Sequence, residues 1–124
     1  MSIMTGNIVR ALILAFVFAA PTFDTAAAGT AYDGWWSLTI VTERGACDRT
    51  YYFQVQVFNG IVSNPNLVRL RGRVSSGGRA RVSVSVMDKY ASGYGRLSRT
   101  TGSGRWSGHS GGDRCSGYWT AQRG

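Results

Sequence analysis

The sequence predicts an all-β protein, a small antiparallel up-and-down barrel of about eight strands closed by one disulfide. Three observations favour this fold class. After residue 28 helix signals are almost absent, and apolar residues alternate with polar ones in the period-two pattern of half-buried strands. Turn residues, mainly Gly, Ser and Asn, separate these short runs. Finally, the two cysteines, Cys47 and Cys115, lie near opposite ends of the strand series.

The first 28 residues have the order of features found in a secretory signal peptide. Arg10 supplies positive charge in an otherwise apolar stretch, residues 8–20. That stretch is shorter than the about 20 residues that a helix needs to span a bilayer. Small residues around Ala26 and Ala28 then fit a signal-peptidase site. We therefore predict a cleaved signal peptide over residues 1–28.

Cleavage after Ala28 leaves one domain, residues 29–124, in the periplasm or outside the cell. Cleavage after Ala31 and an uncleaved anchor are the alternatives. A domain of this size buries only about 60–65% of the surface of its unfolded chain, so it gains much from a covalent link. Two cysteines in an exported chain predict such a disulfide, worth about 4 kcal/mol in the chain-entropy model. We expect a monomer without a transmembrane segment after cleavage.

The alternation places eight strands along the chain, and Asn59-Gly60 between the second and third is its strongest hairpin signal. The expected strands cover about residues 34–42, 49–58, 61–63, 67–74, 80–87, 90–98, a segment around Trp106, and 114–122. Asp88-Lys89 is expected to form a tight turn. A repeated Gly-x-Trp-Ser/Thr pattern puts Trp36, Trp106 and Trp119 in the core, where they contribute to closure.

The positions of the cysteines test whether the sheet closes. In an up-and-down order, Cys47 in the first loop and Cys115 beside the last loop lie at the same end of the sheet. In an open, flat sheet they would be about 28 Å apart, whereas a disulfide needs Cα atoms within about 7 Å. Strands one and eight must therefore meet, which a barrel achieves and which also removes both sheet edges. A two-sheet β-sandwich is the alternative.

The charge of the chain is strongly basic, with a formal net charge of +8. The expected strand phase points arginines outward while Val68, Leu70 and Val74 point inward. Arginine binds carboxylate and phosphate groups with a bidentate geometry, so this face is a candidate anion site, although a solvated basic face is the alternative. Its candidate residues are Arg69, Arg71, Arg73, Arg79, Arg81, Arg96, Tyr90 and Tyr94.

The sequence lacks the groupings that catalysis requires. His109 is the only histidine and is expected in an exposed loop among abundant serines, which does not make a triad. The acids of the mature chain occur singly at turns and strand ends, and no zinc-type spacing is present. We therefore predict no catalytic residues, no metal site and no cofactor.

Gly34-Trp35-Trp36 on the first strand resembles the opening of lipocalin-like barrels. That resemblance implies that a basic residue on the last strand, here Arg123, packs over Trp36. The size, export signal and single disulfide resemble periplasmic barrel inhibitors of metalloproteases and lysozymes, although the long mature tail of the protease inhibitors is missing. The segment from Gly95 to Arg123 is similar to small exported bacterial proteins of unknown function, some labelled for haem use or adhesion.

These observations predict a non-enzymatic binding protein of the cell envelope. The first hypothesis is an anionic partner, a glycan or lipid head groups, held by the arginine face, with no natural nucleic-acid partner. The second is inhibition of a protease or lysozyme, an envelope protein partner, through the loops at one barrel end. The third is a small-ligand carrier. The bulky inward residues speak against a carrier, because they predict an interior filled by side chains.

Overall fold

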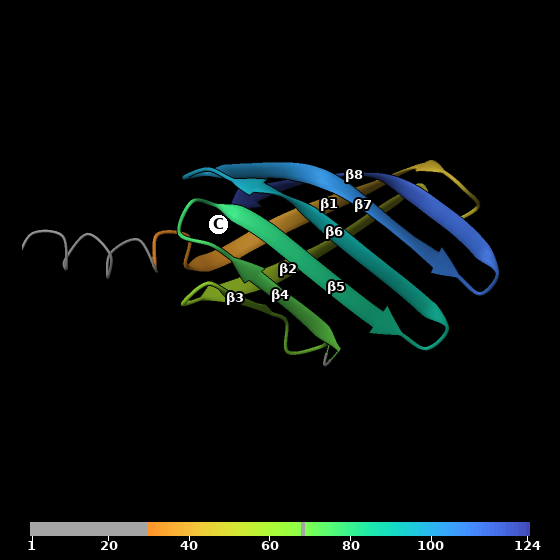
Figure 1. Cartoon of the computed structure of the whole chain (residues 1–124), viewed down its shortest axis with the longest axis horizontal. Coiled ribbons are helices and arrows are strands. Elements are labelled where there is room, and N and C mark those ends of the chain that lie inside the picture. The colour runs from red at the N-terminus through yellow and green to blue at the C-terminus, as the bar shows by residue number, and fades with distance from the viewer. Residues whose placement is uncertain (1–29, 68) are drawn as a thin grey trace, which may run out of the picture.

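The computed structural model describes residues 30–67 and 69–124. They form a closed antiparallel barrel in which each strand pairs with the next and the last returns to the first (Figure 1). The strands are β1 (Gly34–Arg44), β2 (Thr50–Phe58), β3 (Ile61–Ser63), β4 (Leu70–Val74), β5 (Arg79–Val86), β6 (Lys89–Leu97), β7 (Thr101–Ser110) and β8 (Asp113–Arg123). The predicted eight-strand barrel is confirmed over the sandwich. The predicted signal peptide and Val68 lie outside the described residues.

The closing contact is the pairing of β1 with β8, in which Ile40 lies opposite Trp119. Next to it, Cys47 in the β1–β2 loop is bonded to Cys115 on β8, with their Cα atoms 6.1 Å apart. The disulfide therefore links the first loop to the last strand. Strand closure and the disulfide are both confirmed, and in this strand order the disulfide can form only if the sheet closes.

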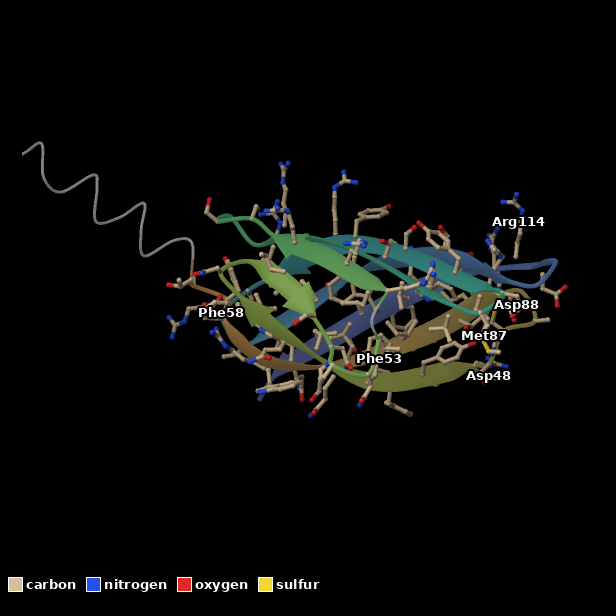
Figure 2. All side chains as sticks on the ribbon, turned by 90° about the horizontal axis from the view of Figure 1, so that it is seen from below. Asp48, Phe53, Phe58, Met87, Asp88 and Arg114 are labelled. Carbon is tan, nitrogen blue, oxygen red and sulfur yellow. A yellow bond between two sulfur atoms is a disulfide. The ribbon has the colours of Figure 1, made fainter. Side chains whose placement is uncertain are left out.

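The barrel has two different ends. Figure 1 shows the β1–β2, β5–β6 and β7–β8 loops at one end, which we call the mouth, whereas the start of β1 and the C-terminus lie at the other, which we call the floor. In Figure 2, Asp48, Met87 and Arg114 lie at the mouth and Phe58 lies toward the floor. The disulfide belongs to the mouth, so it braces the end that the chain termini do not.

Two hairpin turns differ in how well the sequence identified them. Asn59 and Gly60 both have positive φ, at 52° and 77°, as a two-residue hairpin turn requires. The predicted turn at Asp88-Lys89 is wrong by one residue. Met87 adopts φ 56° and forms the turn with Asp88, while Lys89 begins β6 opposite Val86. Methionine carries no local signal for that left-handed conformation, which is rare outside glycine and asparagine.

Arg123 and Trp36 form the centre of the floor. The indole Nε1 of Trp36 donates to the carbonyl of Tyr32 at 2.9 Å. The guanidinium of Arg123 lies over the Trp36 ring and donates hydrogen bonds to the carbonyl oxygens of Arg99 and Asp33. One side chain thus ties the segment before β1 to the β6–β7 loop, and Trp36 is only 1% exposed.

Candidate functional site

The interior of the barrel contains a cavity of about 360 Å³. It extends from Trp36 at the floor to Val86 and Lys89 at the mouth. Its walls are almost entirely apolar, and include Leu38, Ile40, Phe53, Val55, Val57, Val62, Leu67, Val74, Ala80, Val82, Val84, Ala91 and Leu97. The prediction that side chains fill the interior is therefore wrong, and the reason lies in how two tryptophans are placed.

Trp119 lies against the barrel wall instead of filling the centre. A Cβ atom at Gly95 would lie 2.5 Å from Cζ2 of Trp119, and one at Gly104 would lie 2.7 Å from Cε2, so the indole covers the bare backbone of β6 and β7. Its Nε1 donates to the carbonyl of Tyr94 at 3.2 Å. The glycines that interrupt these strands create room at the wall, and that room leaves the centre open.

Trp106 is held at the wall by a similar bond. Its Nε1 donates to the carbonyl of Val41 at 2.9 Å. This hydrogen bond joins β7 to β1 across the inner side of β8, the strand between them. Both indoles are nearly buried and both N–H groups are satisfied, as buried tryptophan requires. The three tryptophans placed in the core by the sequence therefore act differently: Trp36 forms the floor, and Trp106 and Trp119 line the wall.

The barrel wall is shorter at β3 and β4 than at β1 and β8. β3 has 3 residues and β4 has 5, whereas β1 and β8 have 11 each. Figure 1 shows β3 and β4 ending well before the longer strands reach the mouth. Leu67, in the loop that joins them, lines the cavity at this point. On this side, a residue outside the strands therefore contributes to the cavity wall.

The mouth carries the polar atoms of the cavity. Lys89, the only lysine of the chain, lies beside Ser110 on the inward phase of β6 and β7. In the described part of the chain Lys89 makes no ion pair. Tyr51 also lines the cavity, and its hydroxyl accepts a hydrogen bond from the Asp48 amide at 3.1 Å. A ligand with an apolar body and one polar end would suit this arrangement.

The rim of the mouth carries exposed large side chains. Met87 is 98% exposed at the tip of the β5–β6 hairpin, and Figure 2 shows it projecting at the mouth. His109 lies in β7 rather than in the predicted loop, and its ring stacks on that of Tyr90 with centroids 5.9 Å apart. These exposed side chains surround the entrance, and none of them forms a catalytic grouping with a serine.

A second feature lies on the outside of the barrel. The strand register aligns Arg73, Arg81, Tyr94, Arg105 and Tyr118 as direct cross-strand neighbours. We call this set the arginine–tyrosine row. It crosses β4 to β8, one residue from each strand, and all five side chains are exposed.

The other candidate anion-binding residues flank this row. Arg71 lies opposite Ser83, Arg79 lies opposite Arg96, and Tyr90 lies opposite Ser85 on the same outer face. Arg69 precedes β4 in an exposed turn, outside the paired register. The sequence search missed Arg105 and Tyr118, although the outward phase of the last two strands was a sufficient signal for both.

The outer face of β4–β8 carries positive side chains and no negative ones. The outward-facing residues of β4–β8 include no aspartate or glutamate, because Asp113 follows the inward phase at the mouth. Within residues 30–67 and 69–124 the single salt bridge joins Arg105 Nη2 to Glu43 Oε1 at 3.2 Å. Both side chains are about half exposed, so solvent weakens this pair. The other arginines of the row have no carboxylate partner among the described residues.

Comparison with known proteins identifies no relative. The chain matches no family model, and no curated protein or solved structure is similar to it at a significant level. The described residues hold no cluster of three or more His, Cys, Asp or Glu suited to a metal ion. In the same part of the chain, no helix has the length and apolarity to cross a membrane. The cavity and the outer face are therefore the features from which function is inferred.

Proposed function

We propose that this protein is an exported, non-enzymatic binding protein that carries a small apolar ligand inside its barrel. The observation that carries the proposal is the cavity of about 360 Å³ with its apolar wall. Ligand sites in proteins measure roughly 300–1,000 Å³ and combine an apolar lining with a few placed polar groups. This cavity has both properties, and its size lies at the lower end of that range.

The geometry also favours one orientation of the ligand. The floor is closed by Trp36 and Arg123, whose polar groups bond to the backbone. The free polar groups, the Lys89 ammonium and the Ser110 hydroxyl, lie at the mouth. A ligand would therefore enter with its apolar end first and keep its polar end beside Lys89, where water remains accessible.

Two further lines support this proposal. The Arg123–Trp36 contact is the one implied by the resemblance to lipocalin-like barrels, which hold ligands in their interiors. The Cys47–Cys115 disulfide suits an oxidising compartment outside the cytosol, in keeping with the signal peptide expected over residues 1–28. Inhibition of an envelope protease or lysozyme stays a prediction that would use the mouth loops.

Titration with N-phenyl-1-naphthylamine, a neutral apolar fluorophore, tests the proposal. We expect saturable binding with one site per chain. The variant Val84→Trp places a large ring in the cavity, because Val84 lines it, and should abolish binding. Ser83→Trp adds the same ring one residue away on the outer face and should bind as the parent does. Absence of saturable binding by the folded parent, or equal binding by both variants, would reject the carrier function.

A further inference from the structure

We infer that the arginine–tyrosine row is a second binding site, which takes an extended anionic polysaccharide along the outside of the barrel. The row consists of Arg73, Arg81, Tyr94, Arg105 and Tyr118 on five consecutive strands. With strands about 4.7–4.9 Å apart, it measures roughly 19 Å from end to end. This site is separate from the cavity, because its side chains occupy the opposite phase of the same strands.

The charge arrangement of the row points to an anionic ligand. Arg73 and Arg81 lie directly opposite each other, and like charges in this position destabilise a sheet unless solvent or an anion separates them. No carboxylate lies on this face of β4–β8 to do so. Sulfate and carboxylate groups accept two parallel hydrogen bonds from one guanidinium, so an anion would relieve this contact.

The tyrosines explain why a polymer fits better than free ions. Tyr94 lies between Arg81 and Arg105 and is 60% exposed, and Tyr118 extends the row beyond Arg105. Each ring offers an apolar face and a polar hydroxyl. A chain of anionic sugars also carries charged groups separated by apolar ring faces, so it can contact the arginines and the tyrosines of the row at once.

The shape of the surface selects among polyanions. The row curves around five strands of a closed barrel, so a flat membrane surface would contact only part of it, whereas a flexible linear chain can follow all of it. Interleaved basic and aromatic residues also bind single-stranded nucleic acid. The Cys47–Cys115 disulfide favours an oxidising compartment, where polysaccharides rather than nucleic acids are the resident polyanions.

Fluorescence anisotropy with a labelled heparin dodecasaccharide tests this inference. The row variant Arg73→Gln, Arg81→Gln, Arg105→Gln should bind at least tenfold more weakly than the parent. A control variant loses the same charge from three exposed arginines outside the row and should lose less than threefold. Its substitutions are Arg49→Gln, Arg99→Gln and Arg114→Gln. Both variants should bind N-phenyl-1-naphthylamine normally, so failure at this site is distinguished from failure of the cavity.

A second pair of measurements separates a site from diffuse charge. Tyr94→Ala with Tyr118→Ala leaves the net charge unchanged and should weaken heparin binding severalfold. A single-stranded oligothymidylate of matched charge should bind more weakly than the dodecasaccharide at the same salt. Equal losses in the row and control variants, an unaffected tyrosine variant, or tighter binding of the oligothymidylate would each overturn the inference.

Discussion

The guanidinium carbon of Arg123 lies 5.3 Å from the ring centroid of Trp36. This contact joins the last residues of β8 to the beginning of β1, and hydrogen bonds from the same guanidinium reach the carbonyls of Arg99 and Asp33. The floor of the barrel is therefore closed by Trp36 together with an arginine side chain that contacts three segments. These contacts bound the cavity at the floor, and the cavity reaches the other end of the barrel at the mouth.

Replacing Arg123 should weaken the floor. Arg123→Met keeps much of the apolar stem but removes the cation–π contact and the hydrogen bonds, so the free energy of unfolding should fall by about 1–3 kcal/mol. Arg123→Lys keeps the charge without the planar fork and should recover only part of this loss. Urea denaturation followed by tryptophan fluorescence measures both. Equal stability of all three proteins would show that the contact has no structural role.

Glycine beside Trp119 should be irreplaceable. Gly95→Ala brings a Cβ atom into overlap with the carbonyl oxygen of Ser103 and within 2.5 Å of the indole of Trp119. The backbone of β7 and the ring must both shift, which should cost about 1–3 kcal/mol or more. Gly112→Ala is the matched control, because nothing lies within 4 Å of its added Cβ. We expect the control to unfold as the parent does. If Gly95→Ala were equally stable and bound N-phenyl-1-naphthylamine normally, the account of the open interior would be wrong.

The disulfide should contribute a large share of the stability. Cys47 and Cys115 are separated by 68 positions, and in the chain-entropy model a loop of that length contributes about 4 kcal/mol by restricting the unfolded chain. Replacing both cysteines with alanine should therefore lower the urea midpoint sharply or prevent folding at 37 °C. An unchanged midpoint would mean that the strand pairing of β1 with β8 alone is sufficient for closure.

The Arg105–Glu43 pair should matter for binding rather than for folding. Because both side chains are about half exposed, Glu43→Gln should change the unfolding free energy by less than about 1 kcal/mol. The same substitution frees Arg105 and removes a negative charge near the row, so heparin should bind more tightly. Asp88→Asn removes an equal charge at the mouth and serves as the control. Weaker heparin binding by Glu43→Gln would contradict the position assigned to the ligand.

Most of the fold could be predicted from the alternation of apolar and polar residues in the sequence. Inward and outward phases follow directly from a period of two, and the distance between Cys47 and Cys115 in a flat sheet excluded an open arrangement. The turn at Met87 escaped prediction, because a left-handed methionine depends on the pairing of Val86 with Lys89 rather than on its own preference. Local signals identify turns only where the residue itself favours them.

The cavity could not be predicted from the same pattern. The sequence shows that Trp106 and Trp119 point inward, but whether an indole fills the centre or lies on the wall depends on its neighbours across the strands. Gly95 and Gly104 meet Trp119 only through the barrel register, which the sequence alone does not define residue by residue. Three residues of the arginine–tyrosine row, Arg73, Arg81 and Tyr94, were predicted. Arg105 and Tyr118 were missed, although the outward phase of β7 and β8 indicated both.

Methyl NMR with a neutral apolar ligand shows residue by residue whether the barrel interior is a ligand site. Decan-1-ol would be added to the labelled protein while the methyl resonances of Ile40, Val82 and Val84, which line the cavity, are compared with those of Val41 and Ile61 on the outer face. We predict saturable shifts and ligand contacts for the inward methyls alone. Shifts confined to the outer methyls, or no shifts at saturating decan-1-ol, would contradict it.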